Sequence, residues 1–356
     1  MVQSKTDDLR VEALIPLVAP VILMEQIKPD EADLDFVQAA RNQAEAILKG
    51  ADDRLLAIVG PCSIHDSAAA LDYAARLKKL ADHYRGELQI VMRVYFEKPR
   101  TTVGWKGFIN DPDLDESFDI NKGLRLGREL LLKINRLGIA AGTEFLDTIT
   151  PQYIADLVAW GAIGARTTES QSHRQLASGL SMPVGFKNGT AGSISIAVDA
   201  IGAARHPHHF LSVRKEGDAA IVKTKGNDTC HIILRGGKSG PNYSADAIAA
   251  VVAQLESAGL PAYVMVDCSH GNSDKDHNKQ PAVADDLARQ IESGSRAITG
   301  VMLESNLVAG SQKVIPGEDL VYGQSITDAC MGWEATEEVL ERPPKRCARV
   351  GLRTTG

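Results

Sequence analysis

Six basic residues follow short apolar runs along this sequence, at positions where a strand would end. Arginine binds phosphate and carboxylate oxygens through paired hydrogen bonds, and lysine supplies a compact positive charge. The chain as a whole is acidic, with a net charge of −7, so cations gathered at one place would repel one another unless anions bound them. They suit a phosphorylated carboxylate together with a second phosphate group. The six residues are Arg93, Lys98, Arg100, Arg166, Lys187 and Arg235.

A second set combines a thiol, an imidazole and two carboxyl groups, each at or near the end of a predicted strand. Mixed sulphur, nitrogen and oxygen ligands suit Mn²⁺, Fe²⁺, Co²⁺ or Zn²⁺ better than Mg²⁺ or Ca²⁺. The set therefore predicts a site for one divalent metal ion. Spacing alone leaves Cys268 and Cys330 open as alternative sulphur ligands. The set itself consists of Cys62, His270, Glu304 and Asp328.

Both sets need elements that bring residues far apart in the sequence to one place. Eight continuous apolar runs recur along the chain, as expected for strands that are covered on both faces of a parallel sheet. Eight strand-then-helix units fit a (β/α)8 TIM barrel of about 250 residues, whose active site lies at the carboxyl ends of the strands. The predicted strands cover residues 55–59, 89–94, 139–143, 162–166, 183–186, 231–234, 262–266 and 298–303.

Helices are predicted between these runs, and two segments are additions to the barrel. Amphipathic patterns predict helices over residues 68–80, 120–137, 245–258 and 282–291, with a last helix that begins near Ser325. Residues 1–50 form an N-terminal extension with a helix over 31–48, and residues 51–341 form the barrel. Residues 205–229 read as a two-stranded β-hairpin inserted before the sixth strand. Prolines 343 and 344 predict the end of the last helix, and the tail 342–356 is expected to be disordered.

Composition excludes several classes of protein. An acidic chain of 356 residues lacks the basic surface that nucleic acids and anionic membranes attract. The longest apolar stretch, residues 13–24, is too short to span a bilayer. Five scattered cysteines without a C-x-x-C pair do not form a disulfide framework. We therefore expect a reduced, cytoplasmic protein whose partners are small molecules or other protein chains.

Five short blocks of the sequence form a recognisable set: GPCSIH (60–65), FEKPRT (96–101), GARTTES (164–170), GFKNGT (185–190) and ITDAC (326–330). Together they resemble the type I 3-deoxy-D-arabino-heptulosonate 7-phosphate (DAHP) synthases, the transferases of the first step of the shikimate pathway. The resemblance implies a metal-dependent condensation of phosphoenolpyruvate with erythrose 4-phosphate and water, which releases phosphate. It also implies a homo-oligomer, either a dimer or a tetramer, that an aromatic amino acid inhibits.

The resemblance assigns a role to each of the candidate residues. The two substrates would be held by Arg93, Lys98, Arg166, Lys187 and Arg235, by Gly164 and Ala165 of the same block, and by Arg100 and Thr101 at the sugar phosphate. Cys62, His270, Glu304 and Asp328 match the metal ligands, and His270 and Asp328 thereby join the catalytic set. Lys98 would protonate the developing alkoxide, and Glu144 would position the attacking water.

An effector site is also implied, built from the N-terminal extension, the hairpin and the adjacent barrel surface. Ser212 stands where tyrosine-sensitive members tend to carry glycine, so we expect phenylalanine to be the effector. The matching positions are Asp7, Asp8, Pro151, Gln152, Gly179, Leu180, Ser181, Phe210, Ser212 and Val222.

Two other functions remain open from the sequence. One is another phosphoenolpyruvate-condensing sugar-acid synthase, which would act on a pentose phosphate and would not share the KPRT block at 98–101. The other is a catalytically inactive sensor that binds an aromatic amino acid and regulates a partner.

Overall fold

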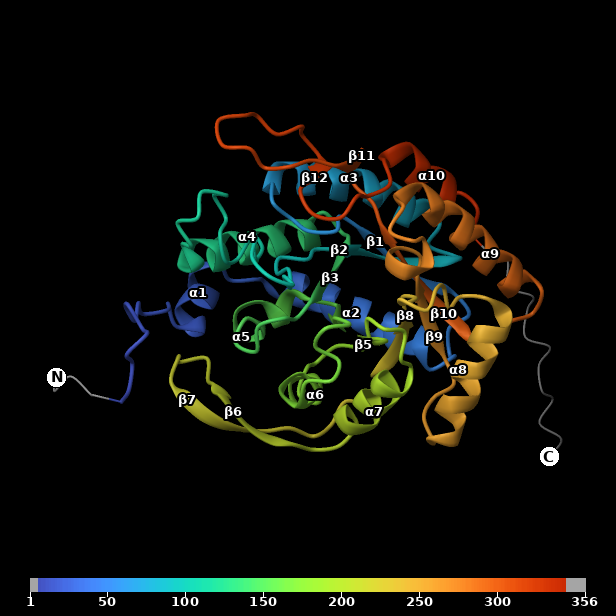
Figure 1. Cartoon of the computed structure of the whole chain (residues 1–356), viewed down its shortest axis with the longest axis horizontal. Helices are drawn as coiled ribbons and strands as arrows, with labels where there is room; N and C mark the ends of the chain where they lie inside the picture. Colours follow the sequence, from blue (N-terminus) through green and yellow to red (C-terminus); the bar gives the residue numbers. More distant parts are fainter. Residues whose placement is uncertain (1–5, 344–356) are drawn as a thin grey trace.

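A closed barrel of eight parallel strands forms the centre of the protein, as the computed structural model of residues 6–343 shows (Figure 1). Around the barrel the strands follow the order β1-β10-β9-β8-β5-β4-β3-β2, and β10 closes the sheet against β1. The predicted (β/α)8 fold is therefore confirmed. The barrel strands are β1 Leu55–Gly60, β2 Leu88–Arg93, β3 Ala140–Glu144, β4 Trp160–Ile163, β5 Val184–Lys187, β8 His231–Leu234, β9 Val264–Asp267 and β10 Ile298–Glu304.

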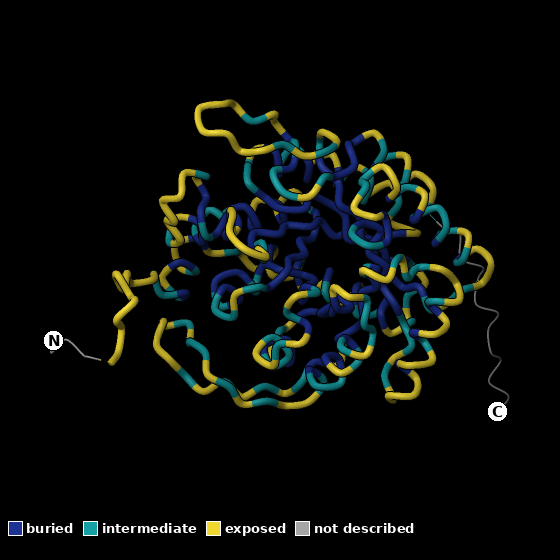
Figure 2. The backbone as a smooth tube through the Cα atoms, viewed as in Figure 1, coloured by how far each residue is buried: buried dark blue, intermediate teal, exposed yellow. Residues whose placement is uncertain are grey.

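Every residue of these barrel strands is buried, which explains their continuous apolar sequences. Helices cover the outer face, and side chains fill the interior, so the dark, buried part of the chain lies at the centre of Figure 2. The surrounding helices are α3 Ser67–His83, α4 Ile120–Arg136, α5 Pro151–Ile154, α6 Gln171–Ala177, α7 Ser195–Ala204, α8 Ala245–Ser257, α9 Gln280–Glu292 and α10 Trp333–Leu340, with short 3-10 turns at Ala155–Leu157, His270–Asn272 and His277–Lys279.

Helix α2 (Glu31–Leu48) covers the amino-terminal end of the barrel. It begins with a capping box in which the side chains of Asp30 and Asp33 each accept a hydrogen bond of 2.9 Å from the backbone N–H of the other residue. From its middle, Arg41 Nε donates to the carbonyl oxygen of Val158, two residues before β4 begins, at 2.9 Å. Ile47 packs in the cluster that fills the barrel interior. The carboxyl-terminal end is thereby left for a site.

The hairpin predicted before the sixth barrel strand is confirmed. Strands β6 (His209–Val213) and β7 (Ala219–Lys223) pair antiparallel between α7 and β8, and Leu211 lies opposite Ile221. A short helix, α1 (Pro20–Gln26), contacts the turn of the hairpin, where Val21 N donates to the carbonyl oxygen of Lys215 at 2.7 Å. Extension and hairpin therefore lie side by side.

The predicted start of the last helix near Ser325 is wrong. Helix α10 begins at Trp333 because the preceding segment is extended and is paired elsewhere. Strand β12 (Gln324–Ser325) pairs with β11 (Val308–Ser311), and Cys330 exchanges backbone hydrogen bonds with Gly310 at 2.8 and 3.1 Å. The helix ends at Leu340, before Pro343, as predicted. The disorder expected for the tail concerns mainly residues 344–356, which lie outside the described residues.

None of the helices in the described range 6–343 is both long enough and apolar enough to cross a lipid bilayer.

Candidate active site

A cavity of about 140 Å³ opens at the carboxyl ends of the barrel strands. Seven of the nine predicted substrate-binding residues line it, so residues far apart in the sequence do meet at one place. Glu144, His270 and Asp328 of the predicted catalytic set also line the cavity. The seven residues are Lys98, Arg100, Gly164, Ala165, Arg166, Lys187 and Arg235.

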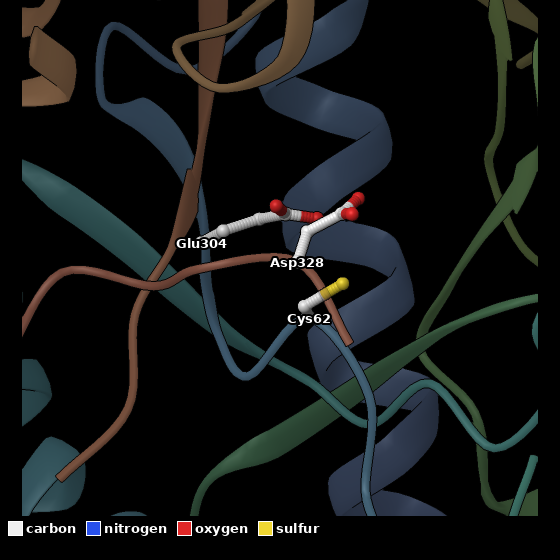
Figure 3. A group of neighbouring side chains, drawn as sticks. All are labelled: Cys62, Glu304 and Asp328. Carbon is white, nitrogen blue, oxygen red and sulfur yellow. The ribbon is translucent and has the colours of Figure 1, made fainter. Parts of the chain in front are cut away.

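Three of the four predicted metal ligands form a tight group beside this cavity. One ligand atom from each of Cys62, Glu304 and Asp328 lies within 4.8 Å of the others, and the three side chains converge in Figure 3. Strands β1 and β10 are neighbours whose register pairs Gly60 with Glu304, which brings the thiol and the first carboxylate together. One thiol and two carboxylates at this separation fit a borderline divalent ion such as Mn²⁺, Fe²⁺, Co²⁺ or Zn²⁺.

The fourth predicted ligand, His270, lies next to this group but not within it. Its Nε2 atom is 3.8 Å from Glu304 Oε1, and its Nδ1 atom is 2.9 Å from Asp267 Oδ2. His270 follows β9, the neighbour of β10, and holds a left-handed backbone conformation with φ of 54°. The imidazole therefore faces Glu304 with one nitrogen and the barrel interior with the other.

Among the rival thiols, the geometry favours Cys62. Burial does not distinguish them, because Cys62 is fully buried with a raised pKa, and so are its two rivals, Cys268 and Cys330. Within the described residues, neither belongs to the group of converging ligand atoms. Cys330 nevertheless lies close by, since its Sγ accepts a hydrogen bond from the backbone N–H of Cys62 at 3.4 Å.

Lys98 joins the cationic residues to the Cys62 side chain. Its Nζ lies 3.1 Å from Cys62 Sγ and 3.2 Å from the carbonyl oxygen of Cys62. Burial lowers the pKa of Lys98, but the negative charges of Cys62, Glu304 and Glu144 outweigh burial and raise it. Lys98 therefore carries a proton at neutral pH and can donate it into the cavity.

The structure does not bring Arg93 into the cavity lining. Its side chain is 1% exposed, its Nη2 is 3.0 Å from Glu304 Oε1, and its guanidinium lies 3.9 Å from the centre of the Tyr95 ring. Burial raises the pKa of Glu304, but His270 and Arg93 outweigh burial and lower it. In this structure Arg93 keeps a predicted metal ligand ionised.

Thr101 is the other predicted substrate residue outside the lining, and it is exposed. Its Oγ1 lies 3.5 Å from Nη2 of Arg166. The other nitrogen of that guanidinium, Nη1, donates to the carbonyl oxygen of Pro99 at 3.3 Å. Strand β4 ends at Ile163, so Arg166 extends from the turn after the strand toward the 98–101 segment. The two blocks of the sequence therefore meet across the cavity mouth.

Glu144 and Gly164 are packed against each other at the ends of β3 and β4. A Cβ atom at Gly164 would lie 2.4 Å from Glu144 Oε1, which is closer than any van der Waals contact allows. The absence of a side chain at position 164 therefore leaves room for the Glu144 carboxylate in the cavity wall.

Four residues of the lining were not predicted: Pro99, Thr190, Lys275 and Thr327. Lys275 adds a sixth cation, from a loop in which both Asp274 and Lys275 have positive φ. Its backbone N–H donates to the carbonyl oxygen of His270 at 2.7 Å. The available signal was the polar run after His270, which includes Lys275 and follows a predicted strand.

A second cavity of about 240 Å³ lies between α5, α6 and the hairpin. Eight of the ten predicted effector residues line it: Pro151, Gln152, Gly179, Leu180, Ser181, Phe210, Ser212 and Val222. Ala155, Leu176 and Lys215 complete the lining and were not predicted. Asp7 and Asp8 lie instead in the exposed N-terminal segment, outside this lining.

The fold and the first cavity define a class: a (β/α)8 barrel with a cavity lined by cationic side chains beside a cluster of possible metal ligands. Residues 31–341 match the DAHP synthetase I family. A Phe-sensitive phospho-2-dehydro-3-deoxyheptonate aldolase from Escherichia coli is 60% identical over 95% of this chain and 96% of the relative. A Trp-sensitive enzyme of that name from Enterobacter agglomerans is 55% identical over 95% of this chain and 97% of the relative.

Solved structures agree with this assignment. The phospho-2-dehydro-3-deoxyheptonate aldolase of Francisella tularensis superposes with a TM-score of 0.92 at 52% sequence identity, covering 94% of this chain and 97% of that one. The chain therefore belongs to the DAHP synthetase I family, and the resemblance inferred from the five sequence blocks is confirmed.

Proposed function

We propose that this chain condenses phosphoenolpyruvate with erythrose 4-phosphate and water to give DAHP and phosphate, the first step of the shikimate pathway. One observation carries the proposal. Six cationic side chains line a cavity whose wall also includes Asp328 of the Cys62–Glu304–Asp328 group. Two phosphorylated substrates bring enough negative charge to occupy such a cavity. The names of the relatives support the same reaction.

Phosphoenolpyruvate carries its carboxylate and phosphate on one carbon, so it needs cations on more than one side. Lys187 and Arg235 follow the neighbouring strands β5 and β8, and Arg166 follows β4 on the other side of β5. These side chains would surround the carboxylate and the phosphate of one phosphoenolpyruvate molecule. Arg100, and Thr101 beside Arg166, would then bind the phosphate of the sugar.

A divalent ion at Cys62, Glu304 and Asp328, with His270 as a fourth ligand, would act as a Lewis acid and polarise the aldehyde of the sugar. This group would hold one Mn²⁺, Fe²⁺, Co²⁺ or Zn²⁺ ion. The buried ion pair between Arg93 and Glu304 supports an ionised carboxylate at Glu304. An ionised carboxylate is what a bound metal cation requires.

Bond formation would join C3 of phosphoenolpyruvate to the aldehyde carbon of the sugar. Lys98 would give its proton to the oxygen of that aldehyde as the oxygen becomes an alkoxide. Glu144 would orient the water that adds to C2 and would accept its proton. Phosphate would then leave with cleavage of its C2–O bond, which produces the ketone of the product.

The second cavity would bind an aromatic amino acid, for which phenylalanine is favoured. Phe210 and Leu180 line this cavity and would offer apolar contact for a ring. Ser212, where tyrosine-sensitive members tend to carry glycine, would occupy the space that a phenol hydroxyl needs. Lys215 supplies a cation for the carboxylate of the effector. Asp7 and Asp8 would reach this cavity from a second copy of the chain, so the proposal includes a homo-oligomer, either a dimer or a tetramer.

The test is release of phosphate from phosphoenolpyruvate by the purified chain, measured with erythrose 4-phosphate and, in parallel, with arabinose 5-phosphate. The proposal expects phosphate release when the sugar is erythrose 4-phosphate and none when it is arabinose 5-phosphate. It also expects phenylalanine to inhibit that release. Release with arabinose 5-phosphate would favour a different sugar-acid synthase. Absence of release with either sugar, in the presence of metal, would favour an inactive sensor.

A further inference from the structure

Asp267, the last residue of β9, is a fully buried carboxylate that the assigned roles leave unused. One of its oxygens, Oδ2, lies 2.9 Å from Lys187 Nζ and 2.9 Å from His270 Nδ1. Its other oxygen accepts hydrogen bonds from the backbone N–H and the hydroxyl of Ser269, at 3.0 and 2.6 Å. A single carboxylate thus contacts one residue of the proposed phosphoenolpyruvate site and one of the proposed metal site.

The contact with His270 sets which nitrogen is free to bind a metal ion. Nδ1 is in ion-pair contact with Asp267 Oδ2, but its hydrogen bond goes to the Ser269 hydroxyl, which itself donates to Asp267. Nδ1 therefore carries the hydrogen, and the lone pair remains on Nε2, the nitrogen that faces Glu304. Histidine ligands of metal ions commonly donate their other N–H to a neighbouring acceptor, which fixes the ring and raises its basicity; here the acceptor is Ser269, held by Asp267. The Ser269 hydroxyl lies 2.7 Å from the same Nδ1 and 2.6 Å from Asp267, so it supports this arrangement.

The contact with Lys187 sets the position of a cation in the substrate cavity. Lys187 ends β5 and is 3% exposed, so its ammonium group has little water to solvate it. A buried ammonium group needs an anionic partner. Asp267 is that partner, and it does not itself line the cavity. Without that charge, the Lys187 ammonium would lose its buried ion-pair partner and, with it, its fixed position.

We propose that Asp267 is a positioning residue that orients the His270 imidazole for the metal ion and the Lys187 ammonium for phosphoenolpyruvate. The inference rests on the proposed function and deepens it. Asp267 touches neither substrate nor metal ion in this account; it acts through the two side chains that do. Its removal should therefore weaken two separate binding events.

The test compares Asp267→Asn with the unaltered chain in two direct binding measurements. Asparagine keeps the shape of the side chain and an oxygen for Ser269, but it removes the charge. Binding of Mn²⁺ to the metal-stripped protein, followed by electron paramagnetic resonance, should weaken about 10- to 100-fold. Binding of phosphoenolpyruvate to the metal-stripped protein, followed by calorimetry, should weaken about tenfold or more, because the buried ion pair that holds Lys187 is lost.

Two further variants separate positioning from a general loss of structure. Lys187→Met should weaken phosphoenolpyruvate binding and leave Mn²⁺ binding within about twofold. Asp33→Asn removes a buried carboxylate of α2 that pairs with Arg136 at 2.8 Å, far from the cavity, and should change neither binding constant. Circular dichroism establishes that each variant is folded.

If Asp267→Asn binds both ligands as the unaltered chain does, or loses affinity for only one of them, the shared positioning role is wrong. That result would leave the proposed function intact, provided that the unaltered chain binds both ligands and turns over. If the unaltered chain binds neither Mn²⁺ nor phosphoenolpyruvate, the proposed function itself fails. The two failures are therefore distinguishable.

Discussion

Lys98 is the residue on which the proposed proton transfer depends. It is the cation closest to the Cys62 thiol, at 3.1 Å, and its raised pKa keeps it protonated in a buried setting. A charged donor at this place can protonate an alkoxide as it forms, which is where general acid catalysis has its effect.

Replacing Lys98 with methionine should lower kcat by about 10²- to 10⁴-fold, the usual range for loss of a general acid. Steady-state phosphate release measures this, and Mn²⁺ binding shows whether the neighbouring metal site survives. Lys106→Met, an exposed lysine of the same loop, is the matched control and should retain full turnover. Near-normal kcat in Lys98→Met would refute the assigned role.

Glu97, the neighbour of Lys98, carries the clearest pH dependence. Burial and, to a lesser extent, the charge of the nearby Asp147 raise its pKa to about 8, although hydrogen bonds from Leu146, Asp147 and Thr150 act in the opposite direction. The folded protein therefore holds a proton on Glu97 that the unfolded chain releases near the ordinary glutamate pKa of 4.5. Stability from this group is complete below the unfolded pKa and declines as pH rises toward about 8.

Glu97→Gln should remove this decline, because glutamine cannot ionise. The free energy of unfolding of the variant, relative to the unaltered chain, should increase steadily between about pH 5 and pH 8 and then level off. Urea denaturation at several pH values measures the difference. Parallel stability curves across this range would show that Glu97 is not protonated in the fold.

At the scale of the elements, continuous apolar runs made the eight strands predictable because each is buried on both faces. The positions of three converging metal ligands followed from the same reasoning, since strand ends in a barrel share one face. The extended segment before α10 was not predictable, because its partners, Gly310 and Ser311, belong to β11, a short strand outside the barrel. Asp267 and Lys275 were missed because their roles depend on partners from other strands and loops.

At the scale of the elements, a prediction concerns Glu144 at the end of β3 and Gly164 directly after β4. Gly164→Ala would place a Cβ against the end of the flexible Glu144 side chain, so the carboxylate should move while the barrel stays folded. Displacement of a catalytic group by about 1 Å can cost up to about 10²-fold in rate. Turnover should fall to that extent, with little change in melting temperature.

Gly202 provides the control for this substitution. A Cβ at Gly202 in α7 would meet nothing within 4 Å, so Gly202→Ala should keep full turnover and slightly raise stability. If Gly164→Ala behaves like Gly202→Ala in turnover, the position of Glu144 does not matter for the reaction.

At the scale of the whole molecule, exposed apolar side chains gather on the hairpin and on the N-terminal segment. Leu211 and Ile221, opposite each other on the outer face of the hairpin, are 86% and 69% exposed, and Leu14 and Ile15 are 81% and 83% exposed. Exposed apolar groups at this density are typical of surfaces that bind another chain. The same hairpin lines the second cavity on its inner face, so the proposed association of chains would be linked to the proposed effector binding.

The double variant Leu211→Asp/Ile221→Asp should therefore shift the protein to a smaller oligomer and weaken inhibition by phenylalanine. Light scattering measures the first effect, and the inhibition curve measures the second. Leu137→Asp, at a position 41% exposed on another surface, should change neither. Unchanged mass and unchanged inhibition in the double variant would exclude the hairpin as an interface.

The central claim is that a thiolate-bound divalent ion next to the cationic cavity is required for turnover. The most direct test is titration of the metal-stripped chain with Co²⁺, with near-ultraviolet absorption and phosphate release recorded together. The account predicts a sulphur-to-cobalt charge-transfer band that rises with activity, saturates at one ion per chain, and is lost with activity in Cys62→Ala. Full activity of the stripped chain, or an unchanged band in Cys62→Ala, would contradict it.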